Sequence, residues 1–175
     1  ILKSIKTSEL PRDLLINYYQ TYSSFWGHYS ISVANNLYGK QQAAYQDSLF
    51  ALIDHTSWDY RMSQASYYIW RDTLKSKEIF KELLEIEEVG TPNYAMITHS
   101  YSRLCHHQKK YDEEKKYLML SAIADTRNAT RENASLQSLA LIAYDEQNLA
   151  DAFKFTQSAI DDVISSGIHF RAMEI

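Results

Sequence analysis

Two stretches of this chain repeat each other 38 positions apart: QKKYDEEKKYLMLSAI at residues 108–123 and EQNLADAFKFTQSAI at residues 146–160. A weaker copy lies upstream, so that residues 58–90, 95–126 and 133–165 align with a period of 37–38 residues. The aligned columns hold either small or large side chains: Ala65, Ser102 and Ala140; Leu74, Tyr111 and Leu149; Phe80, Tyr117 and Phe155; and Leu84, Ser121 and Ala159. Stacked helical hairpins need small residues where helices approach and large apolar residues where space must be filled.

The composition also favours helices. Four glycines and two prolines in 175 residues leave little material for hairpin turns or a multi-stranded sheet. Helical spacing of apolar residues predicts helices over residues 11–26, 38–53, 58–71, 75–88, 111–125, 129–146 and 149–165, with a further helix beginning at Thr91-Pro92. Residues 27–36 lack this spacing and are predicted to form a loop.

These elements predict an all-α fold, an α-α superhelix of about four helical hairpins. We interpret residues 1–175 as a single helical-repeat domain. Its predicted parts are an irregular hairpin over 1–55, repeat hairpins over 58–90, 91–126 and 128–165, and the start of a following helix over 168–175. Because the chain begins at Ile1 and not at methionine, we expect it to be a segment of a longer protein.

The repeats resemble tetratricopeptide repeats. In that family the first helix of each hairpin carries a small residue, matched here by Ala65, Ser102 and Ala140, and the second helix opens with an aromatic residue or leucine. Ala152 and Ala159 stand at positions that the family keeps small, whereas Lys77 and Glu114 replace the first of these in the other two repeats. The resemblance implies a tetratricopeptide-repeat-like solenoid; a generic helical repeat is the alternative.

A longer resemblance covers most of the chain. The runs at residues 45–60 (YQDSLFALIDHTSWDY), 121–162 and 165–175 (SSGIHFRAMEI) are similar to a group of Bacteroidetes regulator-like proteins. In that group an exported helical-repeat region precedes a membrane helix, a coiled coil and often a DNA-binding helix-turn-helix. The resemblance implies a periplasmic, signal-receiving domain of a membrane-anchored transcriptional regulator.

The tetratricopeptide resemblance also implies a binding surface. In such arrays the concave surface is built from the outer face of each hairpin's first helix. Here that face would carry Met96, His99, Arg103, His106, Gln137, Leu141 and Tyr144. Arg103, between two histidines, suits an acidic group of a peptide or another carboxylate ligand. An ordinary solvated helix face is the alternative interpretation.

The sequence offers little for chemistry. His99 and His106 share a helix face but Cys105 does not, and a zinc site needs three or four convergent ligands. We find no nucleophile elbow and no glycine-rich phosphate loop, so we expect no catalytic, metal or cofactor site and no enzyme activity. The net charge of −4 argues against a nucleic-acid surface.

We therefore expect a non-catalytic sensor or protein-interaction domain. Its partner would be a protein, a peptide or a small extracytoplasmic ligand, and homodimer formation is left open. The alternatives are a cytoplasmic scaffold that binds peptide tails and an exported accessory binding protein. No stretch approaches the roughly 20 apolar residues of a membrane helix, and no signal peptide is present in this segment.

Overall fold

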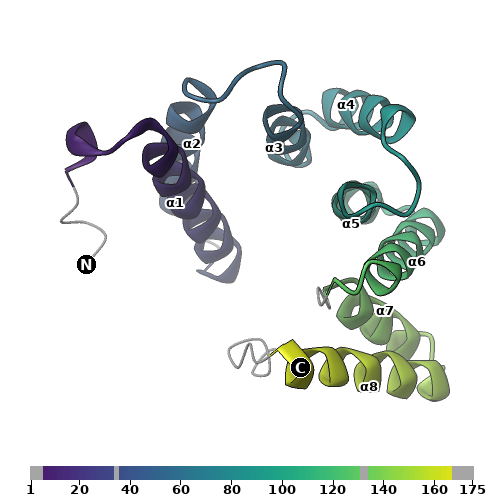
Figure 1. Ribbon diagram of the computed structural model, residues 1–175. Coiled ribbons are helices and arrows are strands. Elements are labelled where there is room, and N and C mark those ends of the chain that lie inside the picture. Colours follow the sequence, from purple (N-terminus) through teal and green to yellow (C-terminus); the bar gives the residue numbers. More distant parts are fainter. Residues whose placement is uncertain (1–5, 34–35, 131–133, 167–175) are drawn as a thin grey trace. The chain divides into compact units, whose positions relative to one another are not determined.

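A computed structural model describes residues 6–33, 36–130 and 134–166. Over these residues the chain forms a short 3-10 turn followed by eight α-helices and no strand (Figure 1). The helices are α1 (Arg12–Val33), α2 (Asn36–Phe50), α3 (Trp58–Tyr68), α4 (Thr73–Ile86), α5 (Pro92–His107), α6 (Tyr111–Arg127), α7 (Ala134–Asp145) and α8 (Leu149–Ser166). The predicted all-α class of helical hairpins is confirmed. The helix predicted over 168–175 lies outside the described residues.

The N-terminal helix is longer than its sequence pattern indicates. A loop was expected over 27–36, but α1 continues to Val33 and α2 already begins at Asn36, so this prediction is wrong. Gly27 lies where α1 and α2 approach closely, since a Cβ atom there would come within 2.7 Å of the Gln42 side-chain nitrogen. Packing against α2 thus extends a helix whose own apolar spacing ends earlier.

Most other boundaries agree within a few residues. α5 begins as predicted, with Pro92 in its first turn and the Thr91 hydroxyl accepting a hydrogen bond from the Tyr94 amide. α4 begins two residues earlier than predicted because the Asp72 carboxylate accepts from the Lys75 amide at 3.1 Å and caps it. The predicted start of the seventh helix at residue 129 is wrong, since residues 129 and 130 are not helical.

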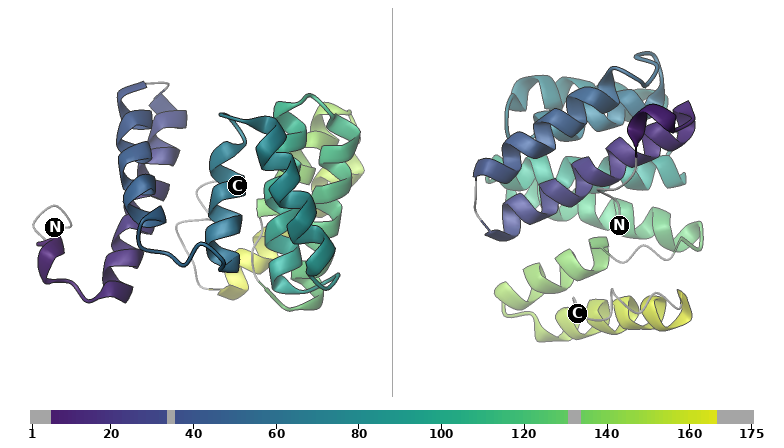
Figure 2. Two further views of the ribbon diagram at one scale, coloured as in Figure 1. Left: turned by 90° about the horizontal axis from the view of Figure 1, so that it is seen from above. Right: turned by 90° about the vertical axis from the view of Figure 1, so that its left-hand side faces the viewer.

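Two compact units make up the chain, residues 1–61 and residues 62–175. In the first unit α1 and α2 pack side by side (Figure 2). Their contact is rich in tyrosine, with the rings of Tyr22 and Tyr45 stacked at 4.9 Å. Between the two helices the Ser23 hydroxyl donates a buried hydrogen bond of 2.6 Å to Gln46.

In the second unit each helix from α4 to α8 packs against the next one along the chain. The fully buried side chains of this unit include Ile69, Phe80, Leu83, Ile97, Leu104, Leu118 and Leu139. Ala65 and Ser102, from the predicted small column, are buried, and the Ser76 hydroxyl of α4 donates to the Ala65 carbonyl of α3 at 2.8 Å. Short side chains therefore let neighbouring helices come within hydrogen-bonding distance.

Three helices of this unit end in the same way. The second residue after each helix has a positive φ without being glycine: Lys109 (59°), Ala129 (51°) and Gln147 (60°). The next amide then bonds back to the last turn, from Lys110 to Cys105, from Thr130 to Asp125 and from Asn148 to Ala143. This is the Schellman arrangement, which usually places glycine at the positive-φ position.

Ala129→Gly and Gln147→Gly are each expected to raise the free energy of unfolding by about 0.5–1 kcal/mol. A residue with a Cβ is strained by about 1–2 kcal/mol in this conformation, and glycine removes that strain. Glycine also has more conformational freedom in the unfolded chain, which cancels part of the stabilisation. Urea unfolding followed by circular dichroism measures the change. Gly90→Ala is the reverse control. Gly90 has a φ of 91°, and a Cβ there would make only an ordinary contact of 3.7 Å with the Arg127 side chain, so a loss of stability reports the backbone conformation.

Candidate functional site

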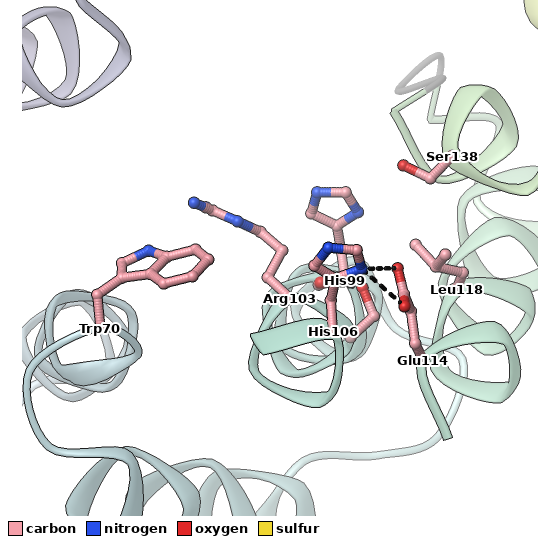
Figure 3. A pocket seen from close by; sticks show the side chains of 8 residues that line it. Trp70, His99, Arg103, His106, Glu114, Leu118 and Ser138 are labelled. Atoms are coloured by element: carbon pink, nitrogen blue, oxygen red, sulfur yellow. Dashed lines mark hydrogen bonds and ion pairs between the residues drawn. The ribbon is translucent and has the colours of Figure 1, made fainter. Parts of the chain in front are cut away.

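The second unit contains a pocket of about 260 Å³ (Figure 3). Its walls come from the turn after α3, from α5, from α6 and from α7. The lining residues are Trp70, His99, Ser102, Arg103, His106, Glu114, Leu118 and Ser138. Three of them, His99, Arg103 and His106, belong to the predicted binding face, and helical spacing places them along one side of α5.

The other predicted residues do not line this pocket. Met96 lies one turn before His99 on α5 and is 52% exposed. On α7 the pocket is lined by Ser138, whereas Leu141 and Tyr144 are exposed and Gln137 is half-buried. The side-chain nitrogen of Gln137 is buried without a hydrogen-bond partner among the described residues. The structure thus gathers the α5 residues and leaves the α7 residues as an adjacent exposed stripe.

Arg103 is the cation of the pocket. Its side chain extends from α5 into the space beside the Trp70 indole (Figure 3). Within the described part of the chain no carboxylate forms an ion pair with it. Arg103 is exposed as a whole residue, but neighbouring groups remove part of the water around its guanidinium, and this partial desolvation lowers the pKa of Arg103. The pocket therefore holds a partly desolvated positive charge without a described counter-charge.

Glu114, the acidic residue of the pocket, is bound to histidine and not to Arg103. Its two carboxylate oxygens lie 3.0 and 2.9 Å from Nδ1 of His106. The Glu114 side chain is only 13% exposed, whereas that of His106 is 60% exposed. This contact joins α5 to α6 at one wall of the pocket.

On the interior side of the pocket, His99 contacts one serine, which in turn contacts a second serine. Its Nδ1 atom lies 3.0 Å from the Ser135 hydroxyl at the start of α7. The Ser135 hydroxyl lies 2.9 Å from that of Ser121 on α6, which lies 3.0 Å from the Ala95 carbonyl of α5. The ring is thereby connected to three successive helices.

Cys105 faces the interior, away from these histidines. It is buried, and desolvation, with the nearby Glu113 carboxylate as a second cause, raises the pKa of its thiol to about 11. Such a thiol is inert at neutral pH. Across residues 6–33, 36–130 and 134–166 no three histidine, cysteine or acidic side chains converge to hold a metal ion.

Sequence reasoning missed five lining residues: Trp70, Ser102, Glu114, Leu118 and Ser138. The repeat alignment predicts only a helix-packing role for Ser102, and Ser102 is indeed buried at 2% exposure. Trp70 and Glu114 line the pocket because other parts of the chain pack near α5. The spacing of residues within α5 cannot indicate this packing. Trp70 lies 37 residues, one repeat period, before His107, and its ring contacts that imidazole at 4.5 Å.

Helical hairpins that pack in chain order, with a polar pocket on α5, define a helical-repeat domain. The chain belongs to the family described as the SusR N-terminal TPR domain, whose model matches residues 1–175. The predicted resemblance to repeat regions of Bacteroidetes regulator-like proteins is confirmed. No curated protein and no solved structure matches the chain significantly. Domains of this type serve protein interaction and are generally non-catalytic.

None of the helices in the described ranges is long and apolar enough to cross a bilayer.

Proposed function

We propose that this domain is the periplasmic, signal-receiving part of a membrane-anchored transcriptional regulator, and that it binds an acidic group of a protein or peptide partner in the α5 pocket. Family membership supports the interaction role. The regulator role and the periplasmic location are supported by the similarity of the runs at residues 45–60 and 121–162 to regulator-like proteins.

The observation that carries the ligand class is the state of Arg103. A guanidinium at a pocket wall without a described counter-charge gains most from a planar anion, because a carboxylate can accept two parallel hydrogen bonds from it. Glu114 does not fill that role, since its oxygens are bound to His106. Trp70 is 50% exposed beside the guanidinium and offers apolar contact area to the remainder of a ligand.

Signal transmission requires that the partner prefer one conformation of the domain. In this proposal the pocket draws on α5, α6 and α7, so an occupant would contact three helices at once. Binding would favour the packing of these helices in which all contacts are made. A partner with equal affinity for both conformations would transmit nothing.

Arg103→Gln is expected to weaken the binding of acidic peptides at least about tenfold, because a charge-assisted hydrogen bond contributes about 1.5–3 kcal/mol. The probes are fluorescent pentapeptides that carry a free carboxyl terminus and one Asp or Glu, compared with peptides in which the terminus is amidated and Asn or Gln replaces the acidic residue; binding is measured by fluorescence polarisation. Arg127→Gln is the matched control, since it removes an equal charge from the exposed end of α6.

Two results would contradict the acidic-ligand proposal. One is equal binding of the acidic peptides and of the peptides without any carboxylate. The other is equal loss of binding in the Arg103 and Arg127 variants, which would report net charge alone. The location is tested separately by reading the gene on both sides of this segment. An export signal upstream and a membrane helix downstream would support the regulator, and the absence of both would favour a cytoplasmic scaffold.

A further inference from the structure

A chain of three polar contacts runs behind the pocket. It begins at Nδ1 of His99, passes through the hydroxyls of Ser135 and Ser121, and ends at the Ala95 carbonyl, with separations of 3.0, 2.9 and 3.0 Å. Both serines are buried, at 2% and 1% exposure. Between groups this close each contact needs a proton between its two atoms, because two facing lone pairs repel.

The protons can be counted from the far end. A carbonyl oxygen only accepts, so the Ser121 hydroxyl donates to Ala95. The Ser121 proton is then used, so the Ser135 hydroxyl donates to the Ser121 oxygen. With the Ser135 proton used as well, the contact to His99 is satisfied only if Nδ1 carries a hydrogen and donates it to Ser135.

We propose that Ser121 and Ser135 are positioning residues that hold neutral His99 in its Nδ1–H form at the pocket wall. The ring cannot rotate or change tautomer without leaving one of the three contacts without a proton. Nε2, at the opposite edge of the imidazole, is then the nitrogen that gains the proton when His99 becomes charged.

This inference deepens the proposed function, on which its relevance to binding rests. His99 and Arg103 lie one helical turn apart and line the same pocket. A ring whose orientation is fixed from the interior keeps one tautomer and one position in the pocket wall, and a site held in place before binding loses less entropy on binding. The two serines come from α6 and α7, so the orientation of His99 depends on correct stacking of the following repeat.

The test is nitrogen NMR of the full chain labelled with ¹⁵N-histidine, without ligand, at a pH about 1.5 units above the usual histidine pKa of about 6.5. In the wild type, the His99 signal is expected to show a protonated Nδ1 and an unprotonated Nε2. Ser135→Ala is expected to abolish this pattern and give averaged tautomers, whereas Ser135→Thr, which keeps the hydroxyl, restores it.

Ser138→Ala is the matched control. Ser138 also lines the pocket from α7, but its hydroxyl donates to the Ala134 carbonyl of its own helix. The His99 pattern is expected to be unchanged in this variant. An unprotonated Nδ1 in the wild type would overturn the proposal, even if Ser135→Ala did not fold, and so would a wild-type pattern in a folded Ser135→Ala variant.

The measurement is independent of acidic-peptide binding. A confirmed Nδ1–H tautomer without peptide binding would contradict the proposed ligand class and leave the positioning role intact. Conversely, binding that depends on Arg103 together with the opposite tautomer would contradict the positioning role alone. If both hold, Ser135→Ala is expected to weaken acidic-peptide binding about fivefold to tenfold, because the ring loses the partner that orients it.

Discussion

Replacing Phe80 with alanine is expected to lower the free energy of unfolding by about 3–5 kcal/mol. Phe80 on α4 is completely buried, and its ring meets that of Tyr101 on α5 edge to face, with centroids 5.7 Å apart. Removing the ring leaves a cavity between two successive helices, in addition to the lost apolar burial. Because domains of this size have a total stability of about 5–15 kcal/mol, the loss is a large fraction of it.

Urea unfolding followed by circular dichroism measures this loss, and Leu74→Ala is its control on the same helix. Leu74 is 73% exposed, so its truncation should change the free energy of unfolding by less than about 0.5 kcal/mol. Equal losses in the two variants would mean that α4 contributes through helix formation alone and that Phe80 does not join it to α5.

Phe80 and Leu74 also show what the repeat could and could not predict. Both belong to columns of large apolar residues, but the column of Leu74, Tyr111 and Leu149 is 59–73% exposed throughout. Each of these residues is the first or second residue of the second helix in its hairpin. At that position, next to the hairpin turn, one side of the helix is not covered by another helix. Alignment of repeats shows which positions are equivalent, but it does not show which direction they face.

Local signals predicted boundaries where the chain itself determines them. Thr91 and Pro92 begin α5 because the cap and the fixed φ of proline act within one turn. The loop expected after residue 26 was wrong because α1 is extended by contact with α2, as the close approach at Gly27 shows. Contacts between helices are not visible in the spacing of either helix alone.

The residues of the pocket also fall into those that spacing within one helix predicts and those that depend on packing between helices. Helical periodicity alone places His99, Arg103 and His106 on one face of α5, so their grouping could be predicted. Trp70 and Glu114 come from the packing of neighbouring helices, and the serine chain behind His99 joins residues up to 40 positions apart, from Ala95 to Ser135. Whether Met96, Gln137, Leu141 and Tyr144 contribute to binding stays a prediction.

The interior of the second unit is expected to lose stability steeply in alkaline solution. Desolvation, with Tyr117 as the next cause, raises the pKa of Tyr101 to about 12, and desolvation with Glu113 raises that of Cys105 to about 11. The ordinary values are 10.0 and 9.0. Both groups are neutral when protonated, so burial favours the protonated form in the folded state, and the unfolded chain loses its protons at a lower pH.

The sign of the effect follows from this difference. Below about pH 9 both states are protonated and the full stability is present; above it the unfolded state binds fewer protons, so the free energy of unfolding falls with rising pH. The fall continues until the pH passes the folded values near 11 and 12. A difference of two pKa units corresponds to about 2–3 kcal/mol for each group once its folded value is exceeded.

Urea midpoints measured from pH 8 to pH 11 test this expectation, and Cys105→Ala separates the two groups. In the wild type the decline should begin near pH 9, where an unfolded thiol ionises; in the variant it should begin about one pH unit higher, where unfolded tyrosine ionises. A decline of the same onset in both proteins would contradict a role for Cys105. A stability that is independent of pH up to 11 would mean that water reaches both groups. That result would contradict the close packing of α5 on α6 around Tyr101, whose ring centroid lies 4.6 Å from that of Tyr117.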